Sequence, residues 1–290
     1  MRGRTVDLDG PVHYADFGGS GAPVVLVHGL GGSHANWLAV GPRLAAHGRV
    51  LAIDLIGHGL TRSLGRSTRV SANRRLLGRF LAEVAGEPAV LVGNSMGGYL
   101  ALALAAAEPE KVRSLVLVGP AVPIVRGAAF DLQVTLLFAG LTLPFLGGAL
   151  MRRRARRGPE QAVREVLALS CVDVSRIDPA VLSAHLELAR ERATYGPHVR
   201  RDFLAAQRSL MVRLLARRHF YRMVARIRAP ALVVQGARDR LVRLGAVRAL
   251  AAARPDWPLV VLDDVGHVPQ LEAPERFLRA VEPFLRAGST

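Results

Sequence analysis

Continuous apolar runs of strand length recur along the chain, and helix-length segments separate most of them. Runs of four apolar residues without polar alternation are typical of strands buried on both faces of a parallel sheet. They lie at 24–27, 50–53, 89–92, 115–118, 231–234 and 259–262. The expected helices cover about 36–47, 71–85, 96–107, 244–253 and 274–287. This alternation predicts an α/β fold with a mostly parallel, doubly wound sheet.

The segment 121–226 breaks this alternation, because it contains only helical periodicity and no convincing strand. Asp178 and Pro179 form an N-cap followed by proline in the first turn, which predicts a helix start. Pro197 is expected to open another helix that runs towards Arg217. We therefore expect a core made of 1–120 and 227–290, with a helical cap at 121–226 inserted after the sixth strand of the standard order.

Composition agrees with a large folded core and adds few constraints on location. Of 290 residues, 50% are hydrophobic and 21% are charged, which excludes a wholly disordered chain. The single cysteine, Cys171, cannot form an intramolecular disulfide, so nothing requires an oxidising compartment. Residues 1–21 lack the continuous apolar stretch of a signal peptide. The expected location is the cytoplasm, with peripheral contact to a membrane as a variant of that expectation.

The net charge of +16 is concentrated in the predicted cap. Residues 121–226 contain 18 Arg and 8 acidic residues, and the cluster Arg152, Arg153, Arg154, Arg156 and Arg157 follows a 20-residue run, 132–151, that has no charge. Such a run has the length of a membrane span. Internal Pro144, Gly140 and the Gly147–Gly148 pair favour two short buried or pocket-lining helices, and contact with lipid is the second interpretation. No aromatic interleaving or zinc pattern supports nucleic-acid binding.

The sequence Gly93-Asn94-Ser95-Met96-Gly97 lies between an apolar strand and an apolar helix. This is the strand–turn–helix setting in which G-x-S-x-G presents a serine nucleophile on a tight turn. The helix that follows directs its N–H groups towards the turn and favours developing negative charge. The alternative is a serine in a sharp turn of purely structural importance.

A second glycine-rich loop, His28-Gly29-Leu30-Gly31-Gly32, follows the first central strand. The backbone N–H groups of Leu30 and Met96 are the expected oxyanion donors. A phosphate-binding loop is the alternative, but the Lys-Ser/Thr ending of a P-loop is missing. We interpret the His28 side chain as structural rather than as a base.

Two further candidates, Asp239 and His267, follow late strands. With Ser95 they give the chain order Ser, Asp, His. Three alternatives remain at this point. Asp239 has arginine neighbours and could form only a surface ion pair; Asp264 is nearer to His267 in sequence; and His58, in the loop after 50–53, is a competing histidine.

Together these motifs, with Asp54-x-x-Gly57-His58-Gly59, resemble the serine-dependent enzymes of the α/β-hydrolase fold that carry a helical cap, such as esterases and lipases. The resemblance implies attack by Ser95 on an acyl carbonyl, proton transfer to His267 and stabilisation of the imidazolium by Asp239. It implies neither a metal nor an organic cofactor. A serine rather than an aspartate nucleophile argues against the haloalkane dehalogenases and epoxide hydrolases of this fold.

The cap is expected to select the substrate. Its apolar residues are Phe130, Leu136, Leu137, Phe138, Leu141, Leu143, Phe145 and Leu146. We expect substrate contacts from Phe138, Leu141 and Phe145, and from Asn94 and Val268 in the core. The predicted partner is a small hydrophobic or lipid-like carboxylic ester. The alternative is that these cap side chains only pack the cap onto the core.

Two other functions fit the same motifs. The loop around Asn94 also resembles that of meta-cleavage-product C–C hydrolases, in which the Asn before the serine helps to hold the substrate. That family commonly has Trp directly after the catalytic His, and this chain has Val268. A non-catalytic ligand receptor built on the same fold is the third hypothesis. The presence of candidates for all three triad roles argues against it.

Overall fold

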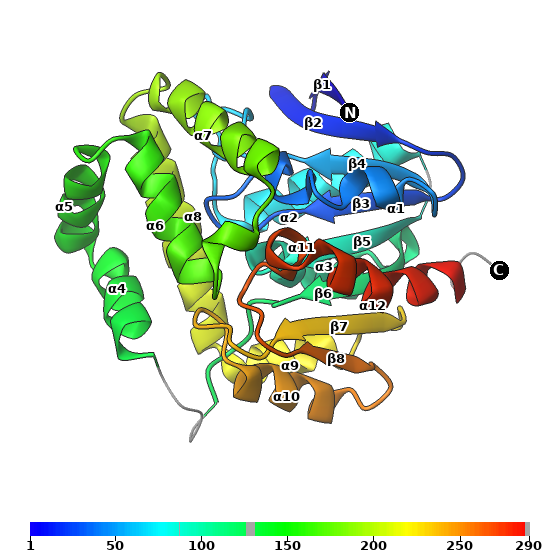
Figure 1. The fold of residues 1–290 in the computed structure, drawn as a ribbon. Helices are drawn as coiled ribbons and strands as arrows, with labels where there is room; N and C mark the ends of the chain where they lie inside the picture. The colour runs from blue at the N-terminus through cyan, green and yellow to red at the C-terminus, as the bar shows by residue number, and fades with distance from the viewer. Residues whose placement is uncertain (87, 126–130, 288–290) are drawn as a thin grey trace.

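A single eight-stranded sheet forms the centre of the molecule, and in Figure 1 its strands are stacked from β1 at the top to β8 at the bottom. The computed structural model describes residues 1–86, 88–125 and 131–287. The strand order is β1-β2-β4-β3-β5-β6-β7-β8; β1 and β2 pair antiparallel, β2 meets β4 antiparallel, and the remaining pairs are parallel. The strands are β1 Arg2–Asp7, β2 Pro11–Gly18, β3 Pro23–Val27, β4 Arg49–Ile53, β5 Ala89–Asn94, β6 Val112–Val118, β7 Ala231–Gly236 and β8 Leu259–Leu262.

Helices cover both faces of this sheet. On one face lie α2 (Val70–Phe80), α3 (Met96–Ala107), α9 (Arg217–Val224) and α10 (Leu244–Ala253); on the other lie α1 (Gly41–Leu44) and α12 (Pro274–Ala287). Strand β3 shows why the apolar runs are continuous: Val25 and Val27 join one core cluster, while Val24 and Leu26 join the other. The predicted α/β architecture with a mostly parallel, doubly wound sheet is therefore confirmed.

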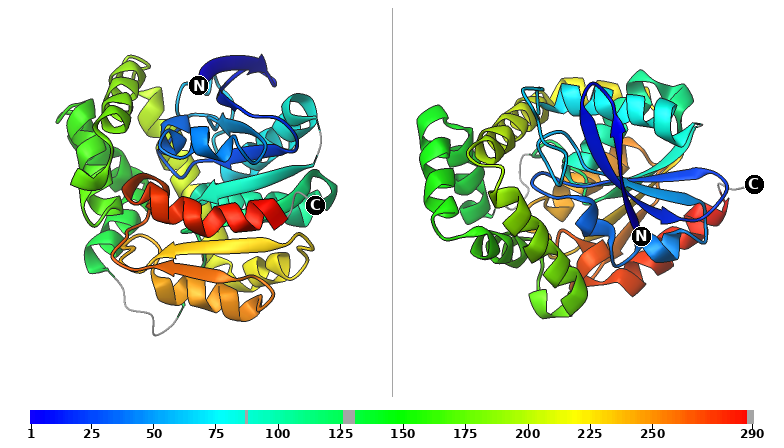
Figure 2. Two further views of the ribbon diagram at one scale, coloured as in Figure 1. Left: turned by 45° about the vertical axis from the view of Figure 1, so that its right-hand side comes forward. Right: turned by 90° about the horizontal axis from the view of Figure 1, so that it is seen from above.

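Helices between β6 and β7 form a separate layer over one end of the sheet (Figures 1 and 2). They are α4 (Leu132–Thr142), α5 (Pro144–Ala155), α6 (Pro159–Ser170), α7 (Pro179–Ala193) and α8 (His198–Leu215). The α7 and α8 starts agree with the proline signals, and the Asp178 side chain accepts hydrogen bonds from Ala180 N and Val181 N. Helix α9, by contrast, packs on the core through Phe220 and Val224. A short helix, α11 (Pro269–Glu272), follows His267.

Two expectations about local structure were wrong or incomplete. The predicted helix 36–47 is instead two short elements, a 3-10 turn at His34–Trp37 that Ser33 caps, and α1. The chain leaves the helical conformation after Trp37 and re-enters it at Gly41. Strands β1 and β2 were not predicted, since β1 is an exposed edge strand with few apolar residues.

No single described helix is long and apolar enough to cross a bilayer. Helices α4 and α5 reach that length and hydropathy only as a pair, and they are bent by 112° at the break between them.

Candidate active site

The turn that holds Ser95 is strained in the way a nucleophile elbow requires. Ser95 has φ 55° and ψ −116°, a positive φ that side-chain-bearing residues rarely adopt. Two glycines make the turn possible: a Cβ on Gly93 would lie 2.6 Å from the Gly97 carbonyl carbon, and a Cβ on Gly97 would lie 2.1 Å from the Val27 oxygen. The G-x-S-x-G spacing therefore follows from backbone crowding on both sides of the serine.

The glycine-rich loop after β3 lies against this serine. A Cβ added to Gly29 would be 3.0 Å from the Ser95 Cβ, so the loop backbone passes directly beside the nucleophile. The N–H groups of Leu30 and Met96 have no hydrogen-bond acceptor within residues 1–86, 88–125 and 131–287. Two unpaired backbone donors close to a serine can stabilise an oxyanion.

His267 and Asp239 form a buried hydrogen-bonded pair. His267 Nδ1 lies 2.7 Å from Asp239 Oδ2, and both side chains are buried. With Nδ1–H donated to the carboxylate, the lone pair of Nε2 is free to accept a proton. The other carboxylate oxygen, Oδ1, accepts the backbone N–H groups of Leu241 and Val242, each at 2.8 Å. Gln235 Nε2 adds a third donor to the carboxylate, at 3.0 Å from Oδ2.

Backbone and side-chain contacts join this pair to the serine turn. Ser95 N donates to Val118 O, and Ala121 N donates to Ser95 O, so the turn is bonded on both sides of Gly119. A Cβ on Gly119 would be 3.2 Å from His267 Nδ1 and 3.3 Å from Asp239 Oδ2. The three predicted triad residues therefore lie at the carboxyl ends of β5, β7 and β8, around one glycine.

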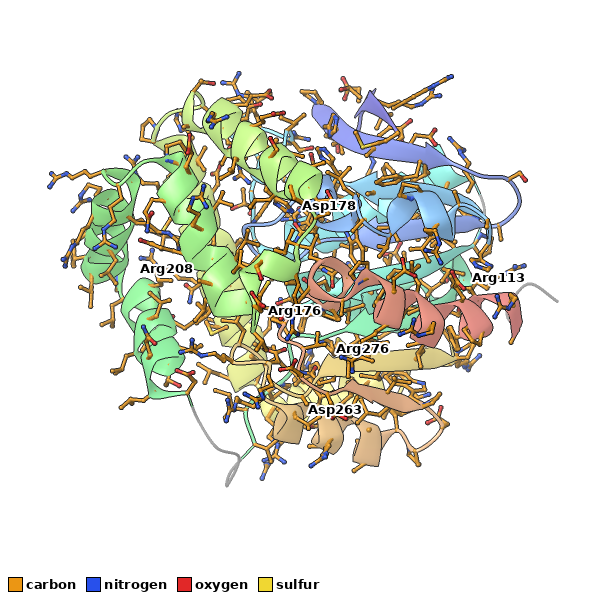
Figure 3. All side chains as sticks on the ribbon, viewed as in Figure 1. Arg113, Arg176, Asp178, Arg208, Asp263 and Arg276 are labelled. Carbon is orange, nitrogen blue, oxygen red and sulfur yellow. The ribbon has the colours of Figure 1, made fainter. Side chains whose placement is uncertain are left out.

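The alternatives for acid and base lie elsewhere. Asp264 is exposed and pairs with Arg176 of the cap at 2.6 Å, while Arg240 pairs with Asp131 rather than with Asp239. In Figure 3, Arg176 and Arg276 lie on either side of the Asp263 loop, and Arg276 donates to Asp263 O. The candidate acid is therefore the buried Asp239.

The two other histidines are structural in their bonding. His28 Nε2 accepts from Leu55 N, its Nδ1 lies 2.7 Å from Gly29 O, and burial lowers the pKa of His28 to about 4. His58 Nδ1 bonds to Ile56 O, and burial lowers the pKa of His58 to about 3. Both rings are therefore neutral at physiological pH and hold the loop after β4.

The loop of His267 is bonded to the cap as well as to the core. His267 N donates to Ser170 O at 2.6 Å, at the end of α6. The buried Glu272 side chain accepts from Gly266 N through Oε2, and from Val172 N and Asp173 N through Oε1. Glu272 and Gln235 were not among the predicted site residues, because nothing in their spacing distinguishes them from ordinary polar positions.

The predicted substrate-contact residues lie in different environments in the structure. Asn94 is buried, and both its amide hydrogens are used internally, on Val118 O and on His267 O; it ties the serine turn to the base. Phe145 is 91% exposed, so the expectation that it lines a wall over the site was wrong.

The remaining predicted contacts are packing residues or lie at the edge of the cap. Leu141 is buried, and Val268 is buried with Leu167 and Val181 of the cap. Phe138 is half-buried, and its carbonyl accepts from Gln207. Phe130 lies outside the described residues. A residue that the sequence did not indicate, Phe203 of α8, covers the oxyanion loop, 3.1 Å from a Cβ added to Gly31.

A cluster of His13, His34 and Asp54 has the composition of a metal site, with one potential ligand atom from each within 4.8 Å of the others. Hydrogen bonds already satisfy it: both Nδ1 atoms reach Asp54 Oδ2, at 2.9 and 3.0 Å, and Leu60 N donates to the same oxygen. Burial acts to raise the pKa of Asp54, but the histidine hydrogen bonds outweigh it and hold that pKa far below its usual value. The cluster anchors the β4 loop.

Comparison with known proteins agrees with this geometry. The chain is 32% identical over 276 residues to a 2-hydroxy-6-oxo-2,4-heptadienoate hydrolase of Pseudomonas putida, covering 93% of this chain and 91% of the relative. It is 30% identical over 267 residues to a pimeloyl-[acyl-carrier protein] methyl ester esterase of Chromobacterium violaceum, covering 92% and 95%. The crystal structure of a putative lipase from Acinetobacter baumannii superposes with a TM-score of 0.81 at 24% identity, covering 99% of this chain and 91% of that one. A family model described as alpha/beta hydrolase fold matches residues 22–274, so the chain with the Ser95 elbow and the Asp239–His267 pair belongs to the alpha/beta hydrolase fold family.

Proposed function

We propose that this protein is a serine hydrolase that cleaves a carboxylic ester with an apolar acyl or alcohol group. The observation that carries the proposal is the strained Ser95 turn beside the buried Asp239–His267 pair. Ser95 attacks the ester carbonyl while His267 Nε2 takes its proton, and Asp239 stabilises the resulting imidazolium. The oxyanion is held by the N–H groups of Leu30 and Met96.

The acyl-enzyme then forms as His267 returns the proton to the leaving alcohol. Water, activated by the same imidazole, attacks the acyl carbon, and Ser95 leaves as the free hydroxyl. Each half-reaction uses the same five groups, so no further acid or base is needed. Phe203, which lies over the oxyanion loop, supplies apolar surface near the reacting carbonyl.

Cleavage of a carbon–carbon bond is the second candidate, and the name of the Pseudomonas putida relative favours it. Two features of this chain favour the ester instead. The amide hydrogens of Asn94 are bound to Val118 O and His267 O and are not free for a substrate. The position after the base is Val268, packed into the cap, and not the Trp of the C–C hydrolases.

A substrate panel separates the two reactions. Purified protein and the Ser95→Ala variant are assayed with p-nitrophenyl esters of increasing acyl length and with vinylogous 1,5-diketones. We expect turnover of the esters, a preference for chains longer than acetate, and loss of activity in Ser95→Ala. Efficient cleavage of the diketones with slow ester turnover would assign the C–C reaction. Equal ester turnover by Ser95→Ala would overturn both.

A further inference from the structure

The outermost layer of the cap has large apolar side chains on its solvent face. Helices α4 and α5 form this layer, on the side of the cap away from the sheet (Figures 1 and 2). On α4, Leu132 is 69% exposed and Leu136, one turn later, is 63% exposed. At the bend between the helices, Leu143, Phe145 and Leu146 are also exposed. Proteins that stay free in water rarely gather large apolar side chains in this way.

The exposed face is not the result of a loosely attached hairpin, because the opposite face is fixed to α8. Val134 and Leu141 are buried on that inner face. Gln207 Nε2 donates to Phe138 O and to Thr142 Oγ1. Arg208, labelled in Figure 3, donates to the carbonyls of Leu143 and Pro144 at the bend. The inner contacts set the orientation of the hairpin and leave the apolar residues outside.

Positive charge lies next to this apolar face. Residues 132–157 include five Arg and no Asp or Glu. Arg154 and Arg157 pair with Glu165 of α6. Arg152, Arg153 and Arg156 are exposed and have no carboxylate within salt-bridge distance in the described part of the chain. They continue the exposed face of α5, about two turns (Arg152 and Arg153) and about three turns (Arg156) beyond Phe145 and Leu146.

We propose that the α4–α5 hairpin docks on the surface of an anionic phospholipid bilayer. Leu132, Leu136, Leu143, Phe145 and Leu146 enter the interfacial region, and the three unpaired arginines contact lipid phosphates. An apolar surface with flanking basic residues is the combination that binds such interfaces. The 112° bend excludes a straight crossing by this pair and suits a shallow insertion. A second copy of the chain is a poorer occupant, because its own arginines would face these.

Vesicle binding is measured without enzymatic turnover, so its result does not depend on whether the protein hydrolyses esters. The full chain is mixed with vesicles of phosphatidylcholine containing 30% phosphatidylglycerol, and with vesicles of phosphatidylcholine alone, and bound protein is separated by flotation. We expect binding to the anionic vesicles, weaker binding to the neutral ones, and release by 0.5 M NaCl.

Two variants and two matched controls locate the surface. Phe145→Ser is compared with Leu64→Ser, another exposed apolar residue, which lies after β4. The triple change of Arg152, Arg153 and Arg156 to Gln is compared with the same change at the exposed Arg226, Arg228 and Arg279. We expect about 10-fold weaker binding for Phe145→Ser and about 100-fold weaker binding for the hairpin triple variant, at roughly fivefold for each of the three charges. Both controls should bind as the original chain does.

Three outcomes would overturn the proposal. The first is absence of binding to the anionic vesicles. The second is an equal loss in the control variants, which would indicate nonspecific attraction by the basic protein as a whole. The third is self-association in gel filtration that Phe145→Ser abolishes while vesicle binding is absent, which would assign this face to a second copy.

Discussion

The side-chain amide of Asn94 donates to the carbonyl oxygen of His267 across 3.1 Å, so the residue before the serine holds the histidine proposed to receive the serine proton. A second hydrogen of the same amide goes to Val118 O at 3.0 Å. Asn94 thus fixes the distance between the ends of β5, β6 and the His267 loop. Its influence on catalysis is through the position of His267 and not through the substrate.

Replacing Asn94 by Ala is expected to lower kcat about 10-fold for short and long esters alike, with KM little changed. Two buried carbonyls lose their donor, which costs about 1–3 kcal/mol of folding free energy each. Asn94→Asp should behave similarly, because a carboxylate cannot donate to these carbonyls. Steady-state kinetics on an ester series measures the effect. A rise in KM with unchanged kcat would instead assign Asn94 to substrate binding.

Asp239→Asn tests the orientation of the base. The Asp239 carboxylate accepts two backbone N–H groups, the Gln235 amide and the imidazole N–H. An amide is uncharged and has one accepting oxygen, so it cannot accept all four donors, and it favours the wrong histidine tautomer. We expect kcat to fall by about 10³–10⁴. Asp264→Asn is the matched control, since Asp264 is bound to Arg176 at the surface, and it should keep its activity. Similar losses in both variants would contradict the assignment.

The glycine pattern around Ser95 makes a prediction about stability. A methyl group on Gly97 would lie 2.1 Å from a backbone oxygen, so Gly97→Ala should destabilise the fold by at least about 2 kcal/mol. Gly148→Ala in α5 meets nothing closer than the end of the Arg152 side chain, at 3.4 Å, and should be neutral or slightly stabilising. Urea unfolding of both variants compares them. A Gly97→Ala protein as stable as the original would refute the crowded turn.

The free energy of unfolding should already decrease at pH values well above those at which carboxylates usually titrate. His28 and His58 have pKa values of about 4 and 3, because they are buried, whereas in the unfolded chain they titrate near 6.5. The unfolded state therefore binds more protons, and stability is lost as the pH falls from about 6.5 to 4, by up to about 1.4 kcal/mol per pH unit for each histidine. Urea unfolding at pH 7.5, 6.5 and 5.5 gives the slope. His58→Asn should reduce it, and an unchanged slope would contradict this origin.

Cys171 should resist thiol reagents in the folded protein. Burial, with the nearby carboxylates of Glu272 and Asp173, raises the pKa of its thiol to about 12. Because the thiolate is the reactive form, labelling by a disulfide reagent at pH 8 should be slow. The protein unfolded in urea should react rapidly, which serves as the control. Rapid labelling of the native protein would show that residues 170–173 open easily.

The triad candidates could be predicted from the sequence because their positions depend on topology. Carboxyl ends of parallel strands meet at one edge, so a Ser, an Asp and a His placed after three such strands are brought together by the fold itself. Gln235 and Glu272 could not be predicted, because their burial depends on how a loop folds back. Phe145 was wrongly placed, because an apolar residue is expected inside and this one is 91% exposed. Strand β1 was not predicted, because an exposed edge strand does not need a run of apolar residues.

The hydrogen bonds from His267 N to Ser170 O, and from Val172 N and Asp173 N to Glu272 Oε1, bear on the engineering of this protein. A cap exchanged between relatives would normally be cut at the strand ends and grafted as a unit. Here the join at 170–173 helps to support the base itself, so a chimera that replaces it loses catalysis even where the new cap folds. Grafts that keep 170–173, Glu272 and α7, whose Val181 packs with Val268, and that change only α4 and α5, should leave the contacts of the base intact.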